Sequence, residues 1–160
     1  MSHIVTIVNS FQVLALTAQL EDFAIMFTDK CLDLIENTSR VETRQEFSHK
    51  DNDLNEDELS VDVSVTETFG KVVLKASPQI FNRVFEKVKN FTQGKIMETG
   101  VSGYILAGMV KSLVTVQPAK TLSFYVPHIC ERIEVAIKER ADVNRTDMEL
   151  QSCLVILTEV

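Results

Sequence analysis

The sequence predicts an all-α fold in which about six helices stack as a helical-repeat solenoid. Apolar residues recur at spacings of three and four through most of the chain, the pattern of a helix with one buried face. Proline or glycine ends these stretches after about 14 to 22 residues, close to the usual length of helices in globular proteins. The sequence shows no alternation of apolar and polar residues between them. We therefore expect residues 1–160 to form one segment built from helices.

The first expected helix covers about residues 17–37, and an acidic segment follows it. Its inward positions carry the side chains Leu20, Phe23, Ala24, Phe27, Cys31, Leu34 and Ile35. Residues 40–62 then contain eight acidic and three basic side chains, so they hold a net charge of −5 in a chain whose net charge is −7. Because such a segment has little apolar surface to bury, we predict a disordered acidic loop over residues 40–62.

Two helices are expected directly after the acidic segment. The pattern Val65, Phe69, Val72, Val73 and Ala76 marks the first of them. It ends at Ser77-Pro78, because Ser77 can cap the next helix and Pro78 can occupy its first turn. That next helix is clearly amphipathic and is expected to end at Gly94.

Three further helices complete the expected fold. One covers about residues 96–116 and stops before Pro118. The next covers about residues 119–140, and its internal Pro127 should bend it, because proline removes a backbone donor. Thr146 and Glu149 have the spacing of a capping box, which predicts a last helix beginning near Thr146.

Helices of this length joined by short turns are typical of HEAT and armadillo arrays, whose units run to roughly 40–47 residues. A closed helical bundle is the alternative, since periodicity predicts buried faces but not the direction in which successive pairs turn. We favour the HEAT/armadillo-like solenoid segment.

Composition narrows the function classes. A net charge of −7 and an isoelectric point of about 5.0 argue against nucleic acid as a partner, since phosphate binding requires clustered basic residues. No apolar run is long enough for a membrane span. Cys31, Cys130 and Cys153 form an odd set without a CxxC spacing, which indicates free thiols in a reducing compartment.

Candidate chemical groups are few. His128 and Cys130 are two positions apart, so on a helix they point in different directions and make a poor catalytic pair. Gly94-Lys95 and residues 100–103 (GVSG) lack the phosphate-binding glycine patterns. We expect no catalytic, cofactor-binding or metal-binding residues, and no cofactor. A locally basic stretch could line a polyanion pocket but is more typical of a solvated face. It comprises Lys71, Lys75, Arg83, Lys87, Lys89 and Lys95.

Several strings resemble, in the same order, a mid-chain stretch of the giant HEAT-repeat proteasome activator family. They are TAQLEDF at residues 17–23, DKCLDLIE at 29–36, IF at 80–81, KVKNF at 87–91, ETGVSG at 98–103 and FYVPHIC at 124–130. These are packing and turn residues, so the specificity of the resemblance lies in their order. It covers about residues 17–137 and continues more weakly to residue 160.

The resemblance implies a scaffold segment of an ATP-independent activator that caps the 20S proteasome core particle and promotes peptide and protein degradation in the nucleus and cytoplasm. It further implies acetylated histones and inositol phosphates as partners of other parts of a full-length protein. The family's gate-opening tail, a hydrophobic residue followed by Tyr and a final residue, does not match Leu157-Thr158-Glu159-Val160.

Two other functions stand beside this expectation. One is an unrelated HEAT or armadillo adaptor that binds a peptide or protein partner, although the tryptophans typical of such grooves are absent from the sequence. The other is a thiol hydrolase using Cys130 and His128, which the spacing disfavours.

Overall fold

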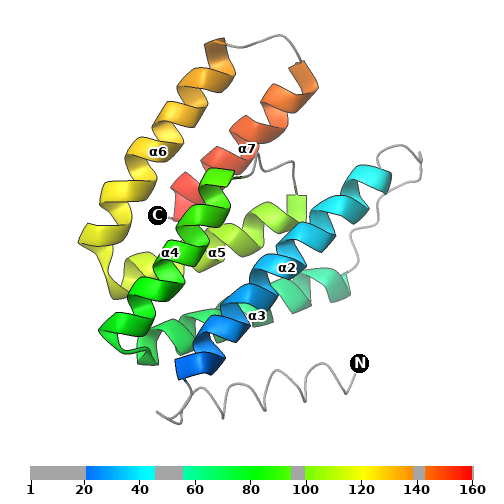
Figure 1. Ribbon diagram of the computed structural model, residues 1–160. Helices are drawn as coiled ribbons and strands as arrows, with labels where there is room; N and C mark the ends of the chain where they lie inside the picture. The colour runs from blue at the N-terminus through cyan, green and yellow to red at the C-terminus, as the bar shows by residue number, and fades with distance from the viewer. Residues whose placement is uncertain (1–20, 46–55, 95–99, 139–142, 160) are drawn as a thin grey trace.

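A computed structural model describes residues 21–45, 56–94, 100–138 and 143–159, and these form six helices without a strand (Figure 1). The helices are α2 (Glu21–Gln45), α3 (Glu56–Lys75), α4 (Pro78–Gly94), α5 (Gly100–Val116), α6 (Pro118–Lys138) and α7 (Val143–Glu159). The all-α prediction is confirmed. None of these helices is both long enough and apolar enough to cross a lipid bilayer.

The predicted bounds of the acidic loop, residues 40–62, are wrong at both ends. Helix α2 continues to Gln45 and α3 begins at Glu56, so residues 40–45 and 56–62 are helical. Glu, Arg and Gln have high helix propensity, and acidic residue types favour the start of a helix, so a net negative charge did not prevent helix formation here. Residues 46–55 lie outside the described residues.

The boundary between α3 and α4 is the one that the sequence predicts. Ser77 Oγ accepts a hydrogen bond from the backbone N–H of Ile80 at 3.3 Å, which is the N-cap contact. The Ser77 carbonyl accepts the first helical bond, from the N–H of Phe81 at 2.8 Å. Pro78 is the first residue of α4. The cap and the proline therefore fix where α4 begins.

Two other helix boundaries, the start of α7 and the turn between α5 and α6, differ in detail from the prediction. The last helix begins at Val143, so Thr146 lies inside α7 and the predicted capping-box start is wrong. Between α5 and α6, Thr121 Oγ1 lies 2.9 Å from the Gln117 carbonyl and 3.2 Å from the Leu113 carbonyl, so the two oxygens share its single hydroxyl proton. The buried Thr121 hydroxyl thus helps to satisfy carbonyls at the end of α5. Pro127 lies within α6, as expected.

The helices form two layers, which we call the first layer (α2, α4 and α6) and the second layer (α3, α5 and α7). In the second layer α5 packs between α3 and α7, and in the first layer α2 packs on α4. Helices α4 and α6 meet through aromatic rings, including Phe85 and Tyr125 at 6.4 Å between centroids. Figure 1 shows α6 and α7 at one end of this stack, with α2 and α3 towards the other.

Neighbouring helices within each layer run parallel. In the first layer, Asn82 contacts Lys120 and Thr92 contacts Arg132, so contacting residues are 38 and 40 positions apart along the whole seam. In the second layer, Gly108 lies against Thr66 and Gly70 against Ser112, again at a constant separation. Sequential neighbours in an up-and-down bundle are antiparallel. The repeated parallel register is therefore that of a solenoid of helix pairs.

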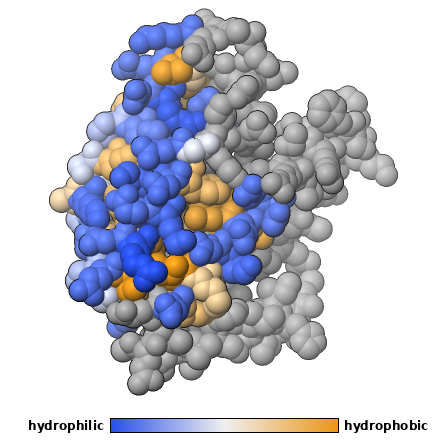
Figure 2. Space-filling view, in the orientation of Figure 1, coloured by the Kyte–Doolittle hydropathy of each residue, from blue (hydrophilic) through white to orange (hydrophobic). Residues whose placement is uncertain are grey.

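Helix α5 lies at the centre of the core. Five of its side chains, Ile105, Leu106, Met109, Val110 and Leu113, have no exposed surface. The first layer covers this core from one side, and its outward surface is mostly hydrophilic with smaller hydrophobic areas (Figure 2). Charged residues of α2, α4 and α6 therefore face solvent while their apolar stripes face α5 and α7.

Candidate functional site

The structure does not bring the His128–Cys130 pair together as a catalytic site. His128 packs at the seam between α4 and α6, where its ring stacks on Phe124 with centroids 5.3 Å apart and an interplanar angle of 18°. The Cys130 side chain is exposed. Residues two apart on a helix point in different directions, and here the His128 ring packs against Phe124.

The surroundings of His128 disfavour the charged form of its imidazole. Its Nε2 atom is buried without a hydrogen-bond partner. Burial lowers the pKa of His128, and the charge of Arg132 lowers it further, whereas the backbone of Thr92 and the carboxylate of Glu131 oppose this decrease. His128 therefore serves as a packing group whose charged form is disfavoured.

Aromatic and basic side chains alternate along the seam between α4 and α6. Phe85 makes edge-to-face contacts with Phe124 and Tyr125, at 6.2 Å and 6.4 Å between ring centroids. Lys120 Nζ lies 4.5 Å from the centroid of Phe85 and donates a 2.6 Å hydrogen bond to Asn82 Oδ1. The lysine thus adds a cation–π contact to the ring cluster. These ring and cation contacts hold α4 and α6 at a spacing set by large side chains.

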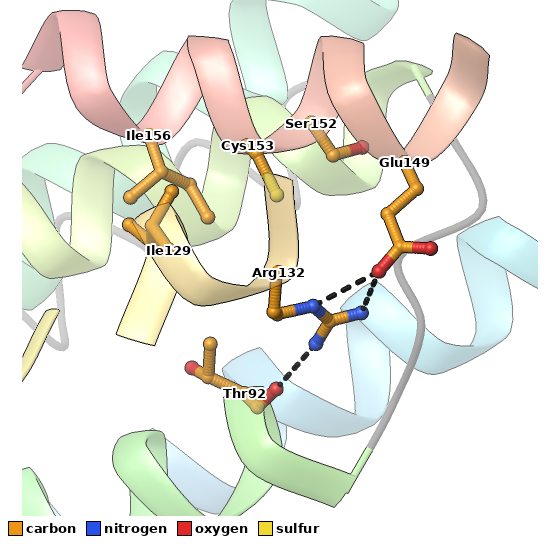
Figure 3. Close-up of a pocket in the computed structure, with 7 residues that line it drawn as sticks. All are labelled: Thr92, Ile129, Arg132, Glu149, Ser152, Cys153 and Ile156. Atoms are coloured by element: carbon orange, nitrogen blue, oxygen red, sulfur yellow. Dashed lines mark hydrogen bonds and ion pairs between the residues drawn. The ribbon is translucent and has the colours of Figure 1, made fainter. Parts of the chain in front are cut away.

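Arg132 of α6 ties three helices together. Its Nε and Nη2 atoms donate to Glu149 Oε1 of α7 at 3.0 Å and 2.8 Å, and Nη1 donates to the Thr92 carbonyl near the end of α4 at 3.0 Å (Figure 3). The two charged side chains are only 16% and 18% exposed. Breaking a pair so shielded from water leaves an uncompensated charge, so the contact is a strong structural constraint.

The small hollow beside Arg132 is a packing defect rather than a ligand site. It is lined by Thr92, Ile129, Arg132, Glu149, Ser152, Cys153 and Ile156 (Figure 3). Its charged groups already satisfy one another, and burial raises the pKa of the Cys153 thiol. A neutral, buried thiol of this kind is a poor nucleophile.

The predicted basic stretch does not converge on a pocket. Lys87 pairs with Asp29 of α2 at 2.7 Å, and Lys89 pairs with Glu86 at 3.0 Å. Lys71, Lys75 and Arg83 are exposed on α3 and α4, and Lys95 lies outside the described residues. With two lysines paired to carboxylates, the solvated-face interpretation fits the described part of this stretch better than a polyanion pocket.

Groups that could hold a metal ion do not occur among the described residues, which contain no cluster of three His, Cys, Asp or Glu side chains. Of the described glycines, Gly94 and Gly103 differ in their surroundings. A Cβ atom at Gly103 would lie 3.7 Å from Ser152 Oγ, whereas Gly94 has open space around it. An added methyl group at Gly103 would therefore make only an ordinary contact with α7.

Sequence analysis missed the Arg132–Glu149 pair. Glu149 was assigned to a capping box, but it binds Arg132. A signal was present, because Arg132 follows Tyr125 and Ile129 at helical spacing and so falls on the buried stripe of its helix. A charge on an apolar stripe predicts a buried partner, although the partner's identity requires the tertiary structure.

Comparison with known proteins gives one consistent result. Residues 8–157 match the family described as "Proteasome activator complex subunit 4, mid HEAT repeats region". The chain is 32% identical over 146 residues to proteasome activator complex subunit 4B of Danio rerio and, over the same length, to proteasome activator complex subunit 4 of Homo sapiens. Both alignments cover 90% of this chain and 8% of the relative.

A relative from Xenopus laevis, proteasome activator complex subunit 4, is 34% identical over 117 residues, which cover 73% of this chain and 6% of the relative. The chain thus spans less than a tenth of the length of these curated relatives. The family match, the all-α fold and the parallel stacking of helix pairs agree with one another. The chain belongs to the proteasome activator complex subunit 4 family, in its mid HEAT-repeat region.

Proposed function

We propose that this chain is a scaffold segment of an ATP-independent proteasome activator that caps the 20S core particle and promotes peptide and protein degradation. The observation that carries the proposal is the family match over residues 8–157. The relatives it resembles are named proteasome activator complex subunit 4, and the matched region is one of HEAT repeats rather than of catalytic groups.

The proposed mechanism is geometric. Parallel stacking of helix pairs builds a continuous wall, and the small rotation from one pair to the next sets its curvature. In this chain the Arg132 contact and the ring cluster around Phe85 fix α6 relative to α4 and α7. Rigid joints of this kind would keep the wall in shape while other parts of a longer molecule contact the core particle. We assign no catalytic step to the chain itself.

The location and the remaining partners are part of the same proposal. We infer a nuclear and cytoplasmic protein, and acetylated histones and inositol phosphates as partners of regions outside residues 1–160. An unrelated adaptor function receives no support, because the relatives found are all named proteasome activator subunits.

The test is an affinity purification from extract of the source cells with an antibody raised against residues 78–140. The recovered antigen is sized by mass determination, its co-purifying proteins are identified, and the peptidase activity of added 20S core particles is measured without ATP. Competition by the recombinant 160-residue chain controls for antibody specificity, and added ATP tests the nucleotide requirement.

The proposal expects a chain much larger than 18.0 kDa, 20S core subunits in the eluate, and peptidase stimulation that ATP does not change. Recovery of an antigen without core subunits and without stimulation would contradict it. In that case the family membership and the fold would stand, but the activator role would not.

A further inference from the structure

His128 lies on the seam between α4 and α6, which is held mainly by long side chains. Helix α6 packs closely against α5 and α7. It reaches α4 through the rings that contact Phe85 and through the hydrogen bond from Arg132 to the Thr92 carbonyl. Regions with few close contacts open more readily than closely packed ones. Among the contacts of α6, those with α4 therefore separate at the lowest cost.

The seam is incompletely packed at its end near Thr92. The small hollow beside Arg132 borders this end, because Thr92 and Arg132 both line it (Figure 3). On the same side of α6, one turn before Arg132, the Nε2 atom of His128 is buried without a hydrogen-bond partner. A buried polar atom without a partner costs free energy that contact with water would recover. Opening this end of the seam would therefore remove that cost.

Charged and titratable groups of three helices lie along this end of the seam. They are Glu86 and Lys89 of α4, Tyr125, Glu131 and Arg132 of α6, and Glu149 of α7. Lys89 Nζ lies 5.3 Å from the centroid of the Phe124 ring on which His128 stacks. Two of the three carboxylates already pair with the two cations, at 3.0 Å and 2.8 Å. The third, on Glu131, acts on His128 less strongly than Arg132 does, so a further positive charge is unfavourable in the closed seam.

We propose that His128 is an acid-sensitive latch between α4 and α6: uptake of a proton by its imidazole opens the end of the seam near Thr92, while α6 stays packed on α5 and α7. In the closed seam a protonated Nε2 would be a buried donor without a partner, beside the positive charge of Arg132. In the open seam the same group reaches water. Because the open form binds the proton more tightly, acid shifts the equilibrium towards it.

The contacts of Arg132 show where the two parts separate. Its Nη1 atom donates to the Thr92 carbonyl of α4 at 3.0 Å, and this bond breaks when the seam opens. Its Nε and Nη2 atoms donate to Glu149 of α7, and these bonds persist because α6 and α7 stay together. The latch therefore acts on one joint of the stack, and it does not depend on the proposed function.

The test compares amide hydrogen exchange in the wild-type chain and in His128→Phe at about pH 7.5 and about pH 5.5, read peptide by peptide with mass spectrometry. The variant keeps a ring against Phe124 but cannot take up the proton, and it retains His3 and His49. Since an imidazole in water has a pKa of about 6.5, proton uptake can raise the open population at pH 5.5 by at most about tenfold.

The expected result is a rise of about three- to tenfold in the ratio of wild-type to variant exchange rates between the higher and the lower pH. This rise should appear in peptides covering residues 86–94 and 124–132, and it should be absent from peptides of α5 and α7. An equal rise in α5 and α7 would overturn the inference, because the acid response would then be global unfolding. An unchanged ratio in residues 86–94 and 124–132 would overturn it as well.

A second measurement does not require the variant to fold. The ring protons of His128 in the wild-type chain are titrated by nuclear magnetic resonance, and the latch predicts a midpoint below the ordinary histidine value of about 6.5. A midpoint at or above that value would contradict the latch, because the closed seam would then impose no penalty on the protonated ring.

Discussion

The two layers of the stack are held together by different means. In the first layer α4 and α6 are joined by large rings and charged groups, including Phe85, Phe124 and Lys120. In the second layer α3 and α5 approach closely through small residues, with Gly108 against Thr66 and Gly70 against Ser112. The two seams therefore differ in kind: large side chains separate α4 from α6, whereas small residues let α3 and α5 come close together.

The largest effect is expected from breaking the ring cluster of the first layer. Phe85 is 2% exposed and contacts rings on both α4 and α6. The substitution Phe85→Ala should lower the free energy of unfolding by about 3–5 kcal/mol, through lost burial and the cavity left behind. Urea denaturation followed by circular dichroism measures this. Phe85→Leu is the matched control and should cost clearly less, and equal losses would argue against a specific ring contact.

The next effect concerns the joint between α4, α6 and α7. Arg132→Met keeps the apolar stem but removes the donors to Glu149 and to the Thr92 carbonyl. We expect a loss of about 2–4 kcal/mol in the free energy of unfolding, because the shielded carboxylate is left unpaired. Lys138→Met removes an exposed pair with Glu134 on the same helix and should change stability by less than about 1 kcal/mol. Similar losses in the two variants would contradict the account.

A smaller loss of stability is expected from adding a methyl group at the close contact between α3 and α5 in the second layer. A Cβ atom at Gly108 would lie 2.6 Å from Thr66 Cγ2 and 2.9 Å from Thr66 Cβ, so Gly108→Ala forces α3 and α5 apart. We expect a loss of about 1–3 kcal/mol despite the higher helix propensity of alanine. Gly94→Ala meets nothing within 4 Å and should be neutral or slightly stabilising. Stabilisation by both substitutions would show that the close approach is absent.

The mildest effect is a dependence of stability on pH through His128. Its pKa is lowered in the folded state, chiefly by burial and then by Arg132, so unfolding takes up a proton once the pH falls below the ordinary histidine range. Stability should therefore be full above about pH 7 and decrease as the pH falls through the lowered pKa. His128→Phe keeps a ring against Phe124 and should flatten this decrease in urea titrations at pH 5 to 8. An unchanged slope would exclude His128 as its source.

Much of the fold could be predicted from the sequence because helix faces and boundaries are local properties. The Ser77-Pro78 boundary depends on two adjacent residues, and the structure confirms the cap at 3.3 Å. The predicted acidic loop is wrong over residues 40–45 and 56–62, because Glu and Arg are good helix formers even where the net charge is negative. The predicted start of α7 is wrong: the helix begins at Val143, and the Glu149 carboxylate binds Arg132.

The joints between helices could not be predicted in this way. The contact between Arg132 and Thr92 spans 40 residues, and the register between Gly108 and Thr66 depends on how two helices cross. Periodicity predicts an amphipathic helix from Pro78 to Gly94, but it does not indicate that the Phe85 ring meets the ring of Tyr125. Long-range register is set by packing, which a single sequence encodes only indirectly.

The parallel register of α3 and α5 is the central claim, because it distinguishes a solenoid from a closed bundle. A Cβ atom at Gly70 would lie 3.8 Å from Ser112 Cβ, which matches the separation in a disulfide. The measurement is disulfide formation in the double variant Gly70→Cys and Ser112→Cys, made in a Cys130→Ser background under mild oxidation and identified by peptide mass spectrometry. The double variant Gly94→Cys and Ser112→Cys serves as the control. Efficient bridging of positions 70 and 112 without bridging in the control is the predicted result, whereas failure of the first pair to bridge in folded protein would contradict the stacked arrangement.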